Sequence, residues 1–223
     1  MLIEEVTPHD ANPEKEHAPM QLIGLLDSPY VRRVAISFSL QGLRFDHQPL
    51  SVFSTFDAFA AINPIVKAPT LVNDDGTVLI DSGLILDLGE RLAAPDLRLI
   101  PSGMDAYVRS QRVIGLALAA CEKTVQIVYE RKLRPAEKQH QPWVDRVQGQ
   151  LVAAYRLLEA EVARANPWLF DGRPLQADVT SAVAFRFSRE MLPGIIDAEA
   201  YPALSRLSAH AEATEAFSAF PYA

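Results

Sequence analysis

The amino-acid sequence predicts an α/β region followed by an all-helical region. Apolar runs of strand length alternate with helical apolar spacing in the first half of the chain, whereas only helical spacing follows. The composition, 49% hydrophobic and 22% charged over 223 residues, is typical of a globular protein with one large or two small domains. We therefore expect a polar N-terminal extension over residues 1–19, an α/β domain over 20–95, a linker over 96–101 and a helical domain over 102–223.

The α/β domain is expected to follow the order βαβ-α-ββα. Ser28-Pro29 marks a helix start, because a serine N-cap is followed by a proline at the first helical position. Asp75-Gly76 is typical of a tight hairpin turn. The expected elements are a strand at 20–26, a helix opened by Ser28-Pro29 and closed by Gly42, a strand around 45–50, a helix within the mixed segment 55–63, a hairpin of Thr70–Val72 and Val78–Ile80, and a helix capped by Ser82, with its apolar stripe at Ile85, Leu88 and Leu92, that ends before Pro95.

The second half shows helical spacing throughout, with prolines at the starts of its segments. Between the second and third segments lies a loop that contains Trp168 and Phe170. Helices are expected at residues 101–132, 142–164, 178–189 and 202–213.

Charge and cysteine content exclude several classes of protein. A net charge of −7 and a pI near 5.2 argue against binding to nucleic acid or to an anionic membrane surface. The longest apolar or glycine run covers only residues 113–121, too short to span a bilayer. Cys121 is the single cysteine, and His9 and His17 are best explained as solvent-facing, so no disulfide and no metal site is expected. Residues 1–19 carry five acids and one lysine and do not form a secretory signal, which favours a cytoplasmic location.

Ser28 has a structural and a functional interpretation. As an N-cap it would stabilise the helix by about 1 kcal/mol. Alternatively, its hydroxyl would donate to a bound thiolate at the positive end of the helix. A free thiol has a pKa of about 8.5, and lowering that by two units takes roughly 2.7 kcal/mol.

Lys67-Ala68-Pro69 stands immediately before an expected strand. Pro69 is either an ordinary turn proline or a cis-proline that exposes the main chain of Ala68 to an extended peptide ligand. Lys67 would then be available to bind a carboxylate, although an exposed lysine is usually only solvated.

Asp81-Ser82 lies between an expected strand and a helix. The structural interpretation is an acid that closes the strand and a serine that caps the helix. The functional interpretation is recognition of an amino-acid zwitterion, with its carboxylate on Ser82 and the helix start and its ammonium group on Asp81.

In this order, these residues resemble the cytosolic glutathione transferase superfamily. Ser28-Pro29-Tyr30 is similar to the motif that opens the first helix of serine-type and cysteine-type members. Asn63-Pro64-Ile65-Val66-Lys67-Ala68-Pro69 is similar to the family's Asn-Pro-x-x-Lys-Val-Pro, whose proline is cis. Asp81-Ser82 is similar to the acid-Ser pair that holds the γ-glutamyl end of glutathione. The likeness runs from Met20 onward and is nearest to bacterial members of the Ser-Pro-Tyr/Phe-Val-Arg type.

The resemblance implies a thioredoxin-like domain, an all-helical domain and a homodimer. It implies that Ser28 stabilises the glutathione thiolate, that Ala68, next to Pro69, pairs with the cysteinyl unit, and that Lys67 contacts the glycyl end. It also implies that Asp81 and Ser82 bind the γ-glutamyl amine and carboxylate. In the helical domain Leu175 replaces the family's hydroxyl residue three positions before Asp178, which is therefore interpreted as a structural cap and not as a catalytic acid.

The expected activity is attack by glutathione, the co-substrate, on a hydrophobic electrophile, without a metal or a redox cofactor. Serine at position 28 cannot form the mixed disulfide that a cysteine would allow, and Cys121 is expected to be buried and inert. Tyr30, Tyr107 and Trp168 are candidates for lining the electrophile site. A non-catalytic interaction or regulatory module with the same fold, or a glutathione-dependent isomerase or peroxidase, is the alternative.

Overall fold

The computed structural model describes residues 19–170 and 172–222. The predicted extension, apart from Pro19, and with it His9 and His17, lies outside the described residues. The elements in chain order are β1 (Met20–Ile23), α1 (Pro29–Leu40), β2 (Phe45–Gln48), α2 (Phe56–Ile62), β3 (Thr70–Val72), β4 (Val78–Ile80), α3 (Ser82–Leu92), the 3-10 helix η1 (Pro95–Leu97), α4 (Met104–Lys132), the 3-10 helix η2 (Ala136–Lys138), α5 (Gln141–Val162), α6 (Gln176–Met191), α7 (Pro202–Glu212) and α8 (Glu215–Ser218).

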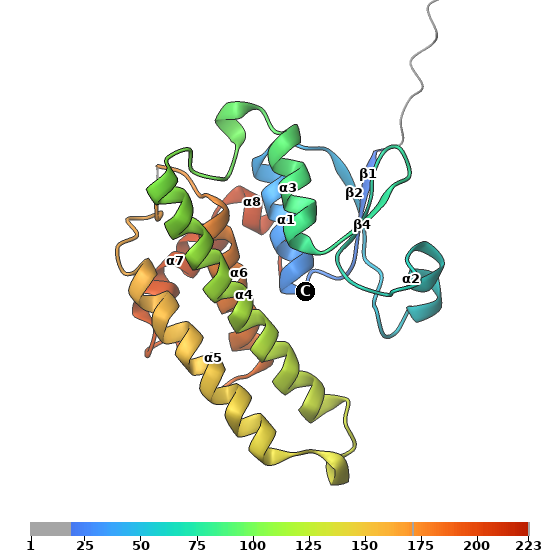
Figure 1. The fold of residues 1–223 in the computed structure, drawn as a ribbon, viewed down its shortest axis with the longest axis vertical. Coiled ribbons are helices and arrows are strands. Elements are labelled where there is room, and N and C mark those ends of the chain that lie inside the picture. The colour runs from blue at the N-terminus through green and yellow to red at the C-terminus, as the bar shows by residue number, and fades with distance from the viewer. Residues whose placement is uncertain (1–18, 171, 223) are drawn as a thin grey trace, which may run out of the picture.

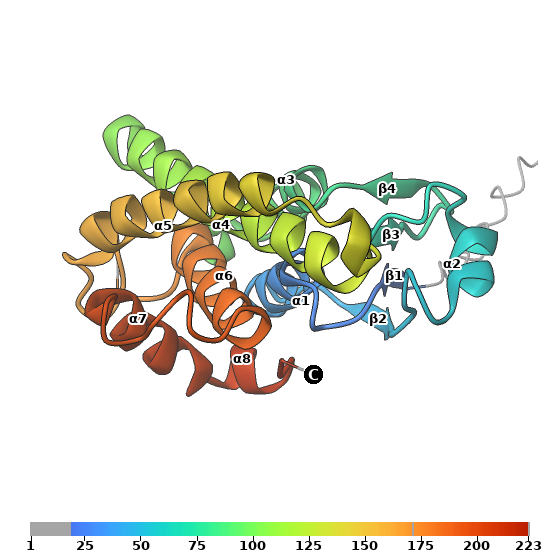
Figure 2. The ribbon, with the colours of Figure 1, turned by 90° about the horizontal axis from the view of Figure 1, so that it is seen from below.

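The first half forms a mixed sheet with the strand order β2-β1-β3-β4. Strand β1 runs parallel to β2 and antiparallel to β3, where Leu22 faces Leu71, and β3 and β4 form the antiparallel hairpin. Helices α1 and α3 lie between the sheet and the helical half, while α2 lies on the other side of the sheet (Figures 1 and 2). The predicted order βαβ-α-ββα and the all-helical second half are thus both confirmed.

Several local expectations are corrected. The cap of α3 is Asp81, whose carboxylate accepts the Gly83 N–H at 2.9 Å, and Ser82 is the first helical residue. Leu92, placed on the buried stripe by its spacing, is 52% exposed because the helix ends there. Helix α8 was not predicted, since a helix of one turn carries too little apolar periodicity to be recognised.

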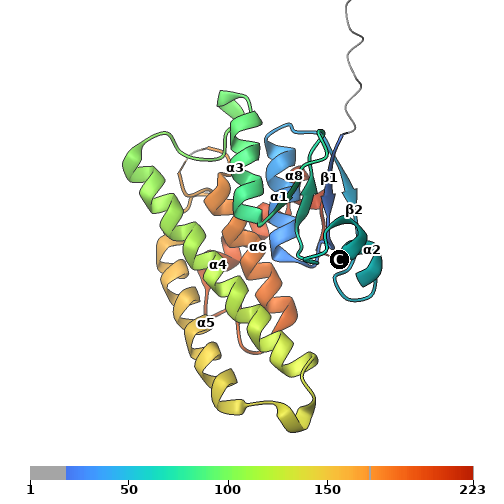
Figure 3. The same cartoon turned by 45° about the vertical axis from the view of Figure 1, so that its right-hand side comes forward.

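Helix α1 is buried on both sides and joins the two halves of the molecule (Figure 3). Val34 and Phe38 pack in the core that includes Leu22 and Leu71 of the sheet, whereas Ile36 packs in the core of the helical half. Arg32, fully buried, donates two hydrogen bonds to the Glu212 carboxylate of α7 at 2.6 and 2.7 Å. The start of α1 is therefore fixed relative to both halves.

The helical half packs α4 against α5 and α6 around one apolar core (Figure 1). Cys121 is 2% exposed in this core, so the expected burial is confirmed, and burial raises the pKa of its thiol to about 12. Asp178, also buried, accepts the N–H groups of Leu175 and Leu169 at 3.0 and 2.9 Å, as expected for a structural cap. Within the described ranges, no helix combines the length and apolarity that a membrane span needs.

The packing of α1 on α3 predicts that Gly89→Ala destabilises the protein. A methyl group at Gly89 would lie 2.7 Å from a ring carbon of buried Phe38, so we expect a loss of about 1–2 kcal/mol in the free energy of unfolding. Gly149→Ala on α5 is the control, because open space surrounds that position and alanine favours the helix. Chemical denaturation checks both variants, and equal stability of the two would contradict the close contact.

Candidate active site

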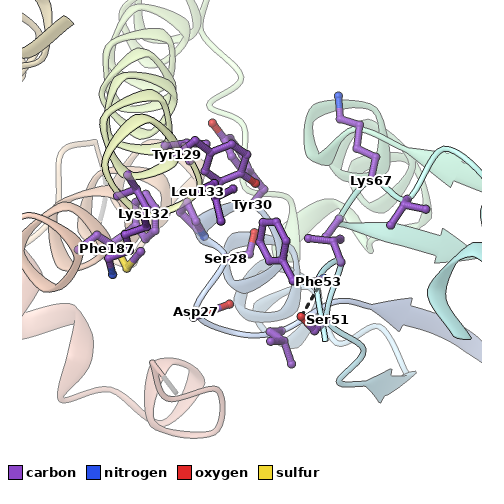
Figure 4. Close-up of a pocket in the computed structure, with 18 of the residues that line it drawn as sticks. Asp27, Ser28, Tyr30, Ser51, Phe53, Lys67, Tyr129, Lys132, Leu133 and Phe187 are labelled. Carbon is purple, nitrogen blue, oxygen red and sulfur yellow. Dashed lines mark hydrogen bonds between the residues drawn. The ribbon is translucent and has the colours of Figure 1, made fainter. Parts of the chain in front are cut away.

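A cavity of about 460 Å³ lies between the two halves, beside the start of α1. Its lining comes from the loop that leads into α1, the loop before α2, residues 66–68 before β3, the last turns of α4 and the end of α6 (Figure 4). The lining brings polar groups of the α/β half together with apolar side chains of the helical half. Such a junction is where binding sites are commonly found.

Ser28 lines this cavity and caps α1. Its extended backbone places the side chain beside the first turn, where its hydroxyl oxygen accepts the Val31 N–H at 3.5 Å. The hydroxyl proton thus remains free to be donated to another group. The N–H of Tyr30 has no acceptor among the described residues, as is usual for the first turn of a helix. Hydrogen-bond donors and the positive end of α1 therefore meet at one wall of the cavity.

Ala68 also lines the cavity, and the Ala68–Pro69 peptide bond is cis, as the resemblance implied. The segment is held by Thr70, whose hydroxyl donates to the carbonyl of Lys67 at 2.8 Å and accepts from Asn63 at 2.8 Å. No hydrogen bond in the described part of the chain uses the N–H or C=O of Ala68. Its main chain is therefore available to an extended ligand.

Gly24 permits the close approach of this segment to α1. Its φ of +139° is a backbone conformation that glycine adopts far more readily than other residues. A Cβ at this position would lie 2.5 Å from the Val31 side chain and 3.1 Å from the Ala68 side chain. Val66 and Asp81, the two non-glycine residues with positive φ in the described ranges, both lie close to this region, at φ 51° and 73°. Such backbone is typical of binding sites, at a cost of about 1–3 kcal/mol each.

Asp81 and Ser82 lie beside the cavity and do not line it. The link is Lys67, which lines the cavity and approaches the Asp81 carboxylate at 3.5 Å, both side chains being about half exposed. Ser82 is 4% exposed, and its hydroxyl oxygen accepts a hydrogen bond from Arg33 at 3.0 Å. Of the predicted glutathione-binding residues, Lys67 and Ala68 thus share the cavity with Ser28. Pro69 follows them in the chain, and Asp81 and Ser82 lie outside the cavity at the start of α3, where they stay a prediction.

The opposite wall is apolar and comes mainly from α4 and α6. Tyr129 of α4, Leu133 directly after α4 and Phe187 of α6 line this wall, and the ring of Tyr129 meets that of Phe53 edge-on at 5.8 Å (Figure 4). Lys132 is the cation on this wall. These residues were not identified from the sequence. The sequence did carry a signal for them, since one face of α4 presents Val125, Val128, Tyr129 and Lys132 at helical spacing. This pattern cannot be told from an ordinary core-facing stripe.

The aromatic residues predicted to line the electrophile site are not all brought together. Tyr30 lines the cavity, and burial raises the pKa of its phenol, which therefore stays neutral. Tyr107 is in the first turn of α4, far along that helix from Tyr129, and is 40% exposed outside the cavity. Trp168 is 7% exposed and packs on His210 at 4.7 Å within the helical half. Contrary to the prediction, Tyr107 and Trp168 therefore do not line this cavity.

Family models match both halves of the chain. The model described as the glutathione S-transferase N-terminal domain matches residues 22–96, and that described as the C-terminal domain matches residues 141–210. The chain belongs to the glutathione S-transferase family. Its sheet with α1–α3 is the thioredoxin-like part of that fold, and α4–α8 form the helical part.

Individual relatives agree with this assignment. The chain is 26% identical over 184 residues to the uncharacterized GST-like protein YibF of Escherichia coli, covering 78% of this chain and 86% of that protein. It is 28% identical over 196 residues to maleylacetoacetate isomerase of Pseudomonas aeruginosa, covering 83% and 87%. A solved glutathione S-transferase of Methylobacterium radiotolerans, in complex with glutathione sulfonate, has a TM-score of 0.84 at 25% identity, covering 92% of this chain and 96% of that one.

Proposed function

We propose that the protein is a cytoplasmic glutathione transferase that conjugates glutathione to a small hydrophobic electrophile. The observation that carries this proposal is that Ser28 and Ala68 line the same cavity, whose opposite wall is apolar. The polar side is suited to a peptide thiol, and the apolar side is suited to its reaction partner. The relative solved with glutathione sulfonate supports glutathione as the thiol.

Thiol activation is the contribution of α1. The Ser28 hydroxyl and the free N–H of Tyr30 would both donate to the sulfur, and the helix terminus adds about half a positive charge. Charge-assisted hydrogen bonds of this kind favour the thiolate over the thiol. A thiol pKa lowered from about 8.5 to about 6.5 needs roughly 2.7 kcal/mol, which the helix terminus and two such donors are able to supply.

The remaining residues would bind the peptide. The N–H and C=O of Ala68 would pair with the cysteinyl unit as a short β-strand addition, and Asp81 and Ser82 would hold the γ-glutamyl amine and carboxylate. Lys67 would contact the glycyl carboxylate. Its exposed ion pair with Asp81 contributes little to stability. Replacing Asp81 by a ligand carboxylate therefore costs little free energy.

The electrophile would lie against Phe53, Tyr129, Leu133 and Phe187. The thiolate would supply the electron pair of the new sulfur–carbon bond, and the leaving group would depart with its own bonding pair. The apolar wall stabilises the complex by burying the electrophile, and it excludes water from the sulfur.

A glutathione-dependent isomerase is the second candidate, because one relative carries the name maleylacetoacetate isomerase. An isomerase that adds and then expels glutathione would use the same thiolate. Product analysis separates the two activities: conjugation consumes glutathione, whereas isomerisation returns it. Failure of the protein to bind glutathione at millimolar concentration would contradict both and would favour a non-catalytic module.

We predict that Ser28→Ala lowers kcat/KM for conjugation of an aromatic halide at least tenfold, the equivalent of about 1.4 kcal/mol of lost thiolate stabilisation. The absorbance of bound thiolate should fall in parallel. Ser39→Ala, an exposed serine on the same helix, is the control and should leave the rate unchanged. An unchanged rate in Ser28→Ala would assign thiolate stabilisation to the Tyr30 amide alone.

We predict that Tyr129→Ala raises KM for an aromatic electrophile about fivefold and leaves KM for glutathione unchanged, because it removes only apolar contact area, worth roughly 1 kcal/mol. Tyr107→Ala is a matched control on the same helix, with 40% exposure against 45% for Tyr129. Equal effects of the two variants would contradict the position of the electrophile.

A homodimer is also proposed, as the family resemblance implies. Large apolar side chains on α3 and at the start of α4 support it: Leu84, Met104 and Val108 are 68%, 71% and 59% exposed in the single chain. Sedimentation equilibrium should give about twice the chain mass of 24.6 kDa. A mass that stays at the single-chain value at micromolar concentration would contradict the dimer.

A further inference from the structure

Lys132, in the last turn of α4, is a cation on the apolar wall of the cavity. It lines the cavity together with Tyr129 and Leu133. Its ammonium group makes no hydrogen bond and no ion pair with any residue in the described ranges. Lys67, the other lysine of the lining, differs in this respect, because it approaches the Asp81 carboxylate at 3.5 Å. Lys132 therefore adds an uncompensated positive charge to an otherwise apolar and aromatic wall.

The end of α4 does not account for this position of Lys132. A lysine in the last turn of a helix commonly interacts with the negative end of the helix dipole. In α4, however, the carbonyl of Arg131 already accepts a hydrogen bond from Gln139 at 3.1 Å, and Arg131 itself is a second cation in the same turn. Glu130, the acid of this turn, is paired with Arg134 at 2.8 Å. The helix end is thus satisfied without Lys132.

The two lysines of the lining lie on different sides of Ser28. Figure 4 shows Lys67 on one side and Lys132 on the other, where Tyr129 and Phe187 also lie. Lys67 is the residue proposed to contact the glycyl carboxylate of the peptide. Lys132 is therefore on the side proposed for the electrophile, and no charged group of glutathione has been assigned to it.

Asp27, the acid of the cavity lining, does not neutralise Lys132. It directly precedes Ser28, and no ion pair joins it to Lys132 in the described part of the chain. An anionic substituent on the electrophile would be repelled by Asp27 and attracted by Lys132. The two charges would therefore set the direction in which such a substituent points.

We propose that the electrophile carries a carboxylate and that Lys132 is the residue that selects it. The inference rests on the proposed function and names a substrate class within it, an apolar or aromatic electrophile with a carboxylate away from its reacting carbon. The apolar stem of Lys132 would lie along the wall beside Tyr129, while its ammonium group, on an exposed residue, binds the carboxylate. The ring of Phe53 would cover the body of the molecule. Because the bound electrophile displaces water, the charges attract each other more strongly than they would in solution.

The test compares two glutathione conjugates by calorimetry at neutral pH and low ionic strength. One is the conjugate of chlorodinitrobenzoate, and the other is that of chlorodinitrobenzamide, in which a neutral amide replaces the carboxylate. The unaltered protein should bind the carboxylate conjugate at least fivefold more tightly than the amide conjugate. Lys132→Met, which keeps the apolar stem, should lose this preference and retain its affinity for the amide conjugate and for glutathione. Lys132→Arg, which keeps a cation, should retain most of the preference.

Arg131→Met is the matched control, because it removes one positive charge from the same turn of α4 but from a residue outside the cavity lining. It should leave the preference unchanged. Added salt gives a second readout, since screening acts over about 10 Å at 0.1 M salt. The preference of the unaltered protein should fall as salt is added, whereas binding of the amide conjugate should change little.

The outcomes separate this inference from the proposed function. Equal affinity of the unaltered protein for the two conjugates would overturn the role of Lys132 and leave the proposed transferase in place. A preference that survives in Lys132→Met, or that is lost to the same extent in Arg131→Met, would do the same. Absence of binding of glutathione and of both conjugates would overturn the proposed function and this inference together.

Discussion

The burial of α1 on both sides is the constraint on which the rest of the structure depends. Its apolar side chains pack in the sheet core and in the helical core, and its polar side chains form hydrogen bonds with three neighbouring helices. Arg32 pairs with Glu212 of α7, Arg33 donates to Ser82 of α3, and Ser37 donates to Gln176 of α6 at 3.1 Å. Each of these buried hydrogen bonds fixes the orientation of the helix against one neighbour. The helix terminus at Ser28 is held in place as a result.

The two halves that α1 joins give the cavity walls of different polarity. The α/β half contributes backbone groups, as at Ala68, and the helix terminus at Ser28. The helical half contributes side chains, among them Tyr129, which is 45% exposed, and Phe187, which is buried.

Local signals in the sequence were sufficient to predict the order of the elements in the fold. Strand-length apolar runs, Ser28-Pro29 and the Asp-Gly turn each act over a few residues, and each appears in the structure where it was expected. The cap of α3 was assigned one residue late, because serine and aspartate are both good caps and only the backbone at φ 73° selects Asp81. Leu92 was wrongly placed on the buried stripe because helical spacing does not show where a helix ends.

The sequence by itself determined the order of elements, the capped start of α1 and the proline loop before β3, because these depend on contacts between near neighbours in the chain. Only the tertiary structure decided that Tyr129 and not Tyr107 lines the cavity, that Trp168 packs in the core, and that Lys132 lies on the apolar wall. Those outcomes depend on how elements far apart in the chain pack against one another, and such long-range packing leaves no periodic signal in the sequence.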